Sequence, residues 1–591
     1  MNNVFRLRVK LIFYVAAIFS AVMVVSFLLK GNAAYSPKHW MITLPATRGK
    51  LLDVNDRLCA VDEAFYVAYL DVNYLKQRYI DSIDAQLSLL VKNFNLPYSP
   101  AELLNGKTRF IRLDESRDRE AIVNKIPTSL LPFISIEIQT RRRQISDYAL
   151  DKIVGRVIDG HGTGGVEEKL DKILKKRKDG KLLLKYHGFV SLSPNIEQII
   201  EPEDGSDVKL SIDIDIQKIC YEEIQKAVLE NNAIAGGVVV METNTGKIRA
   251  MVTTRDWNDA VLGYFEPGSA IKPVIYSIAI ENNIVGPDDV FECNGSVKPV
   301  EDLDIVVKDL EAHGQVDVQK ALAVSCNTAT ILIAKKIKEK MGEYGYYSWL
   351  RRFGLGEKTG VEIAGEIDGV LRKPEQWSKI DFAMISIGHG VGTPPLQFLA
   401  AFNVIANRGE YVYPTLLEEK IPETRRIVSE KTSSLVCQML RKVVEEGTGI
   451  KAQVPGVNVA GKTGTAQKIA AGEGKYFSIF AGFYPYENPK YTILVYIDEP
   501  SNERYLASEV AAPVFASIVR KIIDLSRERW ISFPKGIMPN LKGLSLRDAL
   551  IIMNELGVKN VRFNGTGLVA DQYPEAGSSD LREVVLILEE P

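Results

Sequence analysis

The sequence predicts an α+β fold for residues 206–530, the largest domain expected in this 591-residue chain. Apolar runs of strand length occur at 237–241 and 247–252, and they return at 478–484 and 491–497. The section between these two pairs of runs carries mostly helical periodicity. Strands at both ends of a helical section predict one sheet that joins distant parts of the sequence, with helices packed against it.

An uncharged, mostly apolar run from Leu11 to Leu29 predicts a membrane anchor. Its length suits a bilayer, and the basic residues before it, Arg6 and Lys10 among them, favour a cytoplasmic N-terminus. We therefore expect a single-pass protein of the cell (inner) membrane, with residues 1–30 as cytoplasmic tip and anchor and the bulk of the chain periplasmic. A cleaved signal peptide is the alternative reading of this segment.

The anchor and the main domain are flanked by two further regions. Residues 31–205 are expected to form an N-terminal pedestal domain of the dimerisation type, in which the lysine-rich stretch 171–185 would be a solvated helix face and a turn. After a linker that contains Pro534, residues 536–591 predict a small unit with a capped helix and a final strand.

The composition argues against several classes of function. The formal net charge is −2, so the composition does not indicate nucleic acid as a partner. The five cysteines and five histidines are widely spaced, and there is no C-x-x-C pair. We therefore expect no cofactor and no metal-dependent mechanism.

Ser269 and Lys272 form the first candidate catalytic pair, within the stretch 264–273. If a helix begins at Ser269 after the turn-forming Pro267-Gly268, both side chains lie on one helical face and free N–H groups point at the serine oxygen. A serine hydroxyl needs a base beside it, and a lysine can be that base only when it is neutral. The pair alone is weak evidence, because Ser206 and Lys209 repeat the spacing and an N-cap serine explains either copy.

Two further motifs could complete a site. Ser325 and Asn327 are expected in a turn between helices, where the hydroxyl could relay a proton and the amide could hold a lysine or a substrate carbonyl. The second motif is Lys462, Thr463, Gly464 and Thr465, which is expected on a strand at the edge of the sheet. The lysine would offer a cation for a substrate carboxylate, and the glycine would let another backbone approach closely. The N–H of Thr465 would contribute to an oxyanion hole.

The order of these three motifs resembles the penicillin-binding protein and serine β-lactamase superfamily. The flanking sequences at 266–273, 460–467 and 480–485 resemble class B penicillin-binding proteins in particular, and the residues at 538–543 and 572–577 resemble a PASTA domain. The resemblance implies a penicillin-binding transpeptidase domain on an extended pedestal, followed by a small α/β PASTA-like domain.

The resemblance also implies an activity, peptidoglycan D,D-transpeptidation through a serine acyl-enzyme. Ser269 would attack the D-Ala-D-Ala bond of a stem peptide, Lys272 would accept its proton, and Lys462 with Thr463 and Thr465 would bind the donor carboxylate. β-Lactams would be trapped as imitations of the donor. Cys326 is expected to be a small buried residue and not a second nucleophile.

By the same analogy we expect a role in septal cell-wall synthesis, with a SEDS-family glycosyltransferase and other division proteins as partners. Sporulation- and elongation-type relatives are the alternatives within the class. A β-lactamase, a D,D-carboxypeptidase and a wall-binding scaffold with a vestigial site are the alternatives outside it. The chain length and the motifs support these roles only through likeness to a family, and members of one family can differ in function, so each role needs its own test.

Overall fold

The computed structural model describes residues 38–77, 83–144, 147–186, 195–468, 474–501, 504–531, 536–544 and 546–589. The predicted anchor Leu11–Leu29, Pro534 of the predicted linker and Ser545 at the predicted helix cap lie outside the described residues. Among the helices of the described ranges, none has the length and apolar character needed to cross a membrane.

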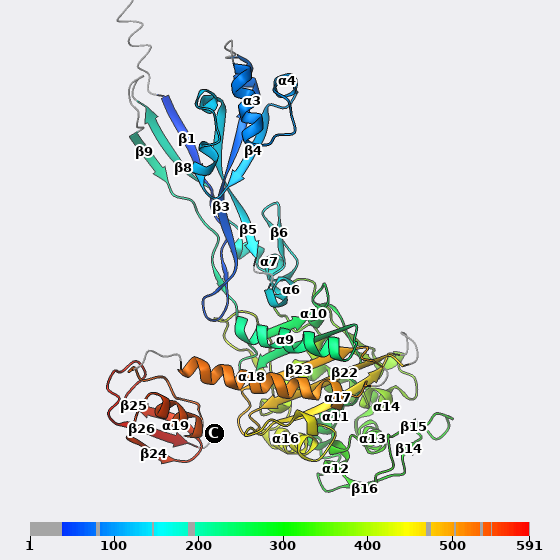
Figure 1. Ribbon diagram of the computed structural model, residues 1–591. Coiled ribbons are helices and arrows are strands. Elements are labelled where there is room, and N and C mark those ends of the chain that lie inside the picture. Colours follow the sequence, from blue (N-terminus) through cyan, green and yellow to red (C-terminus); the bar gives the residue numbers. More distant parts are fainter. Residues whose placement is uncertain are drawn as a thin grey trace, which may run out of the picture. The chain divides into compact units, whose positions relative to one another are not determined.

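The chain folds into two compact units, drawn as ribbons in Figure 1. The described residues up to Lys50, with the segments Ala60–Arg143 and Lys172–Asp207, make up one unit. The segments Leu51–Cys59 and Gln144–Asp171 belong to the other unit, together with everything from Val208 onward.

A three-stranded antiparallel sheet in the first unit is built from β1 (Lys38–Leu44), β8 (Gly180–Tyr186) and β9 (Asn195–Ile200). The prediction of a helix face and turn at 171–185 is therefore wrong beyond α8 (Asp171–Leu174). Leu182 lies opposite Ile42 on one neighbour and Ile199 on the other. Pairing on both sides satisfies the backbone of β8, which outweighs the helical propensity of its lysines.

A second sheet of this unit carries its apolar core. Strands β3 (Leu58–Asp71), β4 (Phe110–Ser116) and β5 (Ile134–Gln144) pack against short helices, and Leu70, Leu87 and Leu130 are fully buried between them. The helices of this layer are α2 (Val72–Gln77), α3 (Ile83–Asn93), α4 (Pro100–Asn105), α5 (Arg119–Val123) and η1 (Thr128–Phe133).

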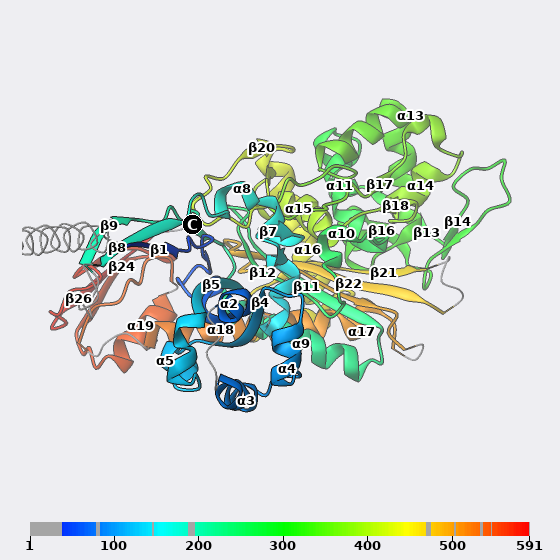
Figure 2. The same ribbon diagram turned by 90° about the horizontal axis from the view of Figure 1, so that it is seen from above.

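The second unit is organised on a five-stranded antiparallel sheet of order β12-β11-β23-β22-β21. This confirms the prediction that strands from both ends of the domain share one sheet. Figure 2 shows α11 (Lys272–Glu281), α13 (Asn327–Arg352) and α15 (Pro395–Ala406) on one side of the sheet. Helices α9 (Ile214–Glu230), α17 (Ala507–Val510) and α18 (Ala512–Ile531) lie on the other side. The strands are β11 (Ala235–Glu242), β12 (Ile248–Thr253), β21 (Ala460–Gln467), β22 (Tyr476–Tyr484) and β23 (Tyr491–Asp498).

Helices α9 (Ile214–Glu230) and α18 (Ala512–Ile531) bury one face of this sheet. Polar and apolar residues alternate over 209–215, a pattern typical of a strand, but the strand found here, β10 (Val208–Lys209), ends at Lys209. The Asp213 side chain accepts hydrogen bonds from the N–H groups of Asp215 and Ile216, at 3.0 and 3.4 Å. This N-cap starts the helix at Ile214, because it satisfies donors that an isolated helix end leaves unpaired.

The helical section that covers the other face is interrupted at two places that matter for the site. Three residues separate helix α12 (Val318–Ala323) from α13 (Asn327–Arg352), and a 3-10 turn, η3 (Gly268–Ile271), precedes α11 (Lys272–Glu281). Further elements of this section are α10 (Asp259–Leu262), β13 (Val290–Cys293), β14 (Ser296–Val297), β15 (Val307–Lys308), β16 (Gly314–Asp317), β17 (Val370–Leu371), η4 (Pro374–Gln376), α14 (Asp381–Ser386), β18 (Val391–Gly392), α15 (Pro395–Ala406), β19 (Glu410–Val412), β20 (Thr424–Arg426) and α16 (Glu430–Glu445).

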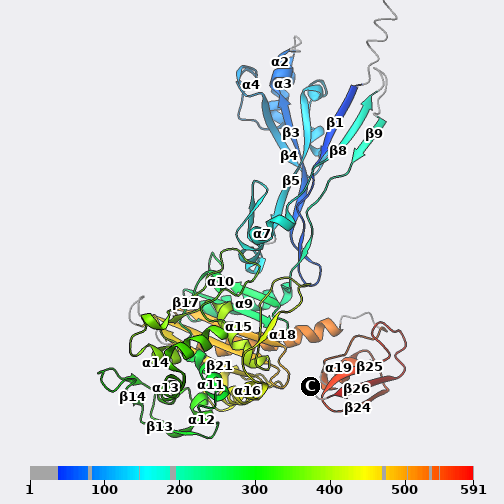
Figure 3. The same cartoon turned by 180° about the vertical axis from the view of Figure 1, so that it is seen from behind.

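The C-terminal segment has a small core of its own. Figure 3 shows the ribbon of its helix α19 beside the strands β24, β25 and β26. Helix α19 (Leu546–Glu555) packs on a sheet of order β24-β26-β25. Met553, Val584 and Leu586 are fully buried in this core. The strands are β24 (Val561–Gly565), β25 (Leu568–Tyr573) and β26 (Val584–Glu589), and the last of them matches the predicted final strand.

Candidate active site

Ser269 lies in the 3-10 turn that leads into α11, where it is half-buried. We predicted an α-helix starting at Ser269, whereas the α-helix begins at Lys272. Gly268 has a φ of 52°, a left-handed conformation that permits the tight entry to this turn. Because a 3-10 helix has three residues per turn, Ser269 and Lys272 are eclipsed on one face. The shared face that the spacing requires is therefore preserved.

The ammonium group of Lys272 is fully buried and held by the turn between α12 and α13. Its Nζ donates hydrogen bonds to the Ser325 carbonyl at 2.6 Å and to Asn327 Oδ1 at 2.8 Å, and it lies 3.3 Å from Ser325 Oγ. The Asn327 amide is oriented by its own donation to the Lys308 carbonyl at 3.0 Å. The structure thus joins the first and second sequence motifs directly.

Lys462 joins the third motif to the same hydroxyl. This fully buried side chain donates to Ser325 Oγ at 3.0 Å and to the Thr463 carbonyl at 3.1 Å. Ser325 Oγ is therefore in contact with the amines of both Lys272 and Lys462. Such a chain of polar groups can pass a proton between the helix and the edge strand.

Burial shifts the pKa values of both lysines downward. Loss of solvent lowers the pKa of Lys272 to about 8, against an opposing effect of the Asp309 carboxylate. Burial, with the charge of Lys272 added, holds the pKa of Lys462 well below its ordinary value. A lysine with a pKa near 8 is partly neutral at physiological pH, which is what a general base requires.

Ser325 has a φ of 60°, an uncommon conformation for a residue other than glycine. The turn that imposes it is held by Asp309, whose carboxylate accepts hydrogen bonds from the N–H groups of Asn327 and Thr328. Cys326 is fully buried, as expected, and its sulfur accepts from the Ala329 N–H at 3.3 Å. Sequence reasoning missed Asp309, because nothing in its local sequence signals that a loop carboxylate caps a helix beginning at Asn327.

The motif 462–465 occupies β21, the edge strand of the sheet, as predicted. A Cβ atom added to Gly464 would lie 2.4 Å from the Pro267 carbonyl oxygen and 2.8 Å from the Ala270 Cβ. Only glycine lets this strand pass so close to the turn that carries Ser269. Gly464 therefore sets the spacing between the nucleophile turn and the edge strand.

Replacing Gly464 with alanine is expected to separate these two segments. The added methyl meets a backbone carbonyl that cannot rotate away, so we expect the free energy of unfolding to fall by about 1–3 kcal/mol and acylation by penicillin to slow. Chemical denaturation and labelling kinetics measure both effects. Gly286→Ala is the control, since its Cβ would come no nearer than 3.9 Å to Asp289. Equal stability and labelling of the two variants would contradict this role.

The threonines of β21 have partners that the sequence did not reveal. Thr463 Oγ1 lies 2.7 Å from Thr448 Oγ1, and Thr465 Oγ1 accepts a hydrogen bond from the Ala507 N–H at 3.0 Å. Thr448 was missed, because no motif links it to the edge strand. Because Thr465 accepts this bond, its hydroxyl keeps a donor for a carboxylate, and Thr463 keeps one when Thr448 is the donor of their pair.

The chain matches the family described as "Penicillin binding protein transpeptidase domain" over residues 236–520, and the PASTA domain over residues 536–589. The penicillin-binding protein PbpB of Mycobacterium tuberculosis is 30% identical over 539 residues, which cover 80% of this chain and 77% of that protein. The chain belongs to the class B penicillin-binding proteins. The peptidoglycan D,D-transpeptidase FtsI of Escherichia coli is 26% identical to this penicillin-binding protein over 508 residues, 81% of this chain and 83% of that one.

Solved structures show the same similarity. Penicillin-binding protein 3 of Mycobacterium tuberculosis in complex with aztreonam superimposes with a TM-score of 0.60 at 28% identity, over 82% of this chain and 97% of that one. The same protein without ligand gives a TM-score of 0.60 at 27% identity, with equal coverage. This penicillin-binding protein therefore has the transpeptidase fold, with a PASTA domain at its C-terminal end.

Proposed function

We propose that this chain is a serine-type peptidoglycan D,D-transpeptidase. The observation that carries the proposal is the buried contact of Lys272 and Lys462 with Ser325, next to the turn that presents Ser269. Relatives named as peptidoglycan D,D-transpeptidases support it, among them FtsI of Escherichia coli. A buried lysine with a lowered pKa beside a serine is an activated pair for acyl transfer.

In the first half-reaction Ser269 Oγ attacks the carbonyl carbon of the D-Ala-D-Ala peptide bond, and its proton passes to Lys272 Nζ. The N–H groups of Ser269 and Thr465 are proposed to bind the resulting oxyanion. When the carbon–nitrogen bond breaks, the proton goes to the departing D-alanine, from Lys272 or through Ser325. In the second half-reaction an amine of a neighbouring stem peptide attacks the ester and restores the Ser269 hydroxyl.

Donor recognition is assigned to the edge strand. Lys462 supplies the positive charge for the terminal carboxylate, whose arrival raises the pKa of this lysine by supplying an opposite charge. The Thr463 and Thr465 hydroxyls supply hydrogen bonds. A β-lactam presents a similar carboxylate and an acylating carbonyl, so it would react as the donor does and remain attached to Ser269.

We further propose a septal role at the inner membrane, with the segment 11–29 as a single-pass anchor, the N-terminus in the cytoplasm and the remaining chain periplasmic. A SEDS-family glycosyltransferase and other division proteins would be the partners. The support consists of relatives with division-type names and of the apolar N-terminal segment with its basic flank. A fluorescent fusion that forms a midcell ring would support this role, while lateral patches would oppose it.

The activity is tested with a stem peptide ending in D-Ala-D-Ala and a labelled amine acceptor. A transpeptidase releases D-alanine and forms the cross-linked product in amounts that depend on the acceptor. Release of D-alanine with water as the main acceptor would identify a carboxypeptidase. Fast, repeated hydrolysis of nitrocefin would identify a β-lactamase. Either result would overturn the proposed reaction.

The rate of acylation should rise with pH. Because Lys272 must be neutral to accept the serine proton, and burial lowers its pKa to about 8, its active form gains population as the pH approaches and passes that value. We expect the second-order rate constant for penicillin to increase more than about tenfold between about pH 6.5 and pH 8, and to level off above about pH 9. Stopped-flow labelling measures it, with penicillin alone at each pH as the control. A flat profile over this range would contradict the assignment of Lys272 as the base.

A further inference from the structure

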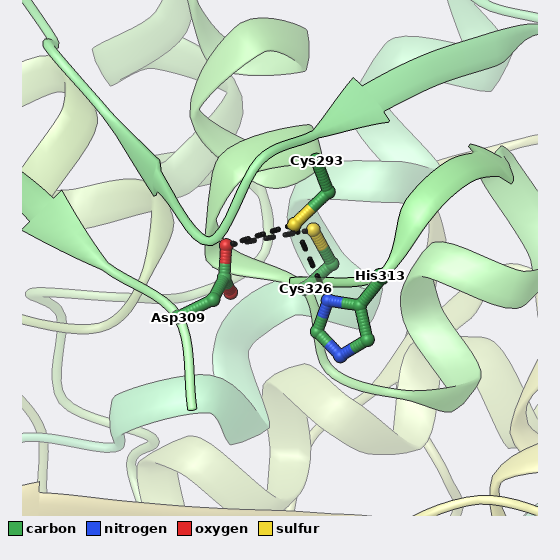
Figure 4. Close-up of side chains that lie close together, drawn as sticks. All are labelled: Cys293, Asp309, His313 and Cys326. Atoms are coloured by element: carbon green, nitrogen blue, oxygen red, sulfur yellow. Dashed lines mark hydrogen bonds between the residues drawn. The ribbon is translucent and has the colours of Figure 1, made fainter. Parts of the chain in front are cut away.

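Four side chains converge beside the catalytic turn, and the mechanism uses none of them as a reactant (Figure 4). They are Cys293, Asp309, His313 and Cys326, and their potential ligand atoms all lie within 4.8 Å of one another. Cys293 Sγ is 3.3 Å from Asp309 Oδ2 and 3.3 Å from His313 Nδ1, and Cys326 Sγ is 3.7 Å from Asp309 Oδ2. The sequence did not predict this group, because 33 positions of chain separate its first and last members and no pair has the spacing of a common metal motif.

The distances fit one metal ion in the centre of the group. Zinc takes four ligands in a tetrahedron, with bonds of about 2.3 Å to sulfur and about 2.0–2.1 Å to nitrogen or oxygen. Neighbouring ligands of such a tetrahedron are then roughly 3.3–3.8 Å apart. The three separations given above, 3.3, 3.3 and 3.7 Å, lie in this range. Two thiolates, an imidazole and a carboxylate are also a ligand set that favours zinc over magnesium or calcium.

The surrounding segment lacks an apolar core that could hold it in place. Among residues 294–312, which join β13 to β16 and are all described, only Pro299 is buried. Its strands β14 and β15 pair over two residues each, and Leu310 is 87% exposed. Short, solvent-exposed segments of this kind are commonly stabilised by a metal ion or a disulfide.

A disulfide between Cys293 and Cys326 is the competing explanation for this cluster. It would use the two sulfurs, but it gives no reason for the imidazole of His313 to point at them. A metal ion accounts for all four groups. The far ring nitrogen of His313, Nε2, lies 3.9 Å from a Glu311 carboxylate oxygen, the kind of outer partner that orients a metal-bound imidazole.

We propose that Cys293, Asp309, His313 and Cys326 bind a zinc ion that fixes the catalytic turn. On binding, the two thiols lose their protons to solvent and each sulfur forms a bond to the metal. Cys326 stands between Ser325 and Asn327, and both of these neighbours contact Lys272. Asp309 already holds the N–H groups of Asn327 and Thr328, so the zinc site anchors the turn from two directions.

Zinc content of the purified, reduced protein is the direct test. We expect about one zinc ion per chain by plasma mass spectrometry, and its removal by a chelator should lower the melting temperature reversibly. Iodoacetamide should modify Cys293 and Cys326 only after chelation. Reduced protein that binds no zinc, or an intact mass and peptide map that show a Cys293–Cys326 disulfide in the freshly purified protein, would overturn the proposal.

Variants distinguish the loss of the zinc site from the general effect of removing a cysteine. His313→Ala and Cys293→Ser should lose the zinc and acylate with penicillin roughly 10- to 100-fold more slowly, because the turn that holds Lys272 is released. Cys437→Ser is the matched control, since this cysteine lies in α16 outside the cluster. It should keep both zinc and rate. Retention of one zinc ion by both His313→Ala and Cys293→Ser would contradict the assignment.

Discussion

Ser269→Ala is expected to abolish covalent labelling by a fluorescent penicillin. Without Oγ no ester can form, whereas the fold should persist because Ser269 is only half-buried in its turn. We expect labelling to fall by at least roughly 10⁴-fold, to the level of the denatured protein, with little change in melting temperature. Gel fluorescence and a thermal melt measure the two quantities on one preparation.

The chain supplies its own control for this experiment. Ser206 and Lys209 repeat the spacing of Ser269 and Lys272, but Ser206 is exposed and lies in the other compact unit. Ser206→Ala should label as the unaltered protein does. Equal labelling of Ser269→Ala and the unaltered protein would remove Ser269 from the mechanism.

Lys272→Ala is expected to slow acylation by roughly 10²- to 10⁴-fold, the usual contribution of a positioned general base. The substitution also removes the hydrogen bonds that hold the Ser325 carbonyl and Asn327. Lys272→Arg should not restore the rate, because a guanidinium stays charged and cannot accept a proton. Rates of penicillin acylation under single-turnover conditions measure the loss.

An exposed lysine gives the matched control for the loss of one positive charge. Lys431→Ala, on the surface of α16, should leave the rate unchanged. The two lysine variants should also differ in pH dependence: the control keeps the rise toward pH 8, while the residual rate of Lys272→Ala lacks it. A normal rate in Lys272→Arg would contradict the role of Lys272 as a base.

Hydrophobic patterning predicted the strands β11, β12, β22 and β23 of the central sheet, because each is a run of buried residues. The edge strand β21 was predicted from its motif instead. The pattern failed at two places where hydrogen bonds, and not side-chain periodicity, decided the local structure. The stretch 171–185 has the composition of a surface helix, yet β8 is held between β1 and β9. Residues 209–215 alternate like a strand, yet the Asp213 cap starts a helix there. At β8 the pairing with distant strands outweighs helical propensity, and at Asp213 a local helix cap outweighs the strand-like alternation.

For the candidate site, the sequence predicted only those residues that belong to the three motifs. The three motifs name the residues that meet at Ser325 Oγ, but they contain no signal for Asp309 or Thr448. These residues act through contacts between segments far apart in sequence. The start of the helix near Ser269 was also set by a local detail, the left-handed Gly268, which turns the first part of the expected α-helix into a 3-10 turn.

Mass spectrometry of a penicillin adduct tests the central claim most directly. The protein is incubated with penicillin, digested, and the modified peptide is sequenced. We predict a single adduct on the peptide that contains Ser269, with the fragment ions placing the added mass on this serine. An adduct on Ser325, on Cys326 or on any other residue, or the absence of an adduct from folded protein, would contradict the account.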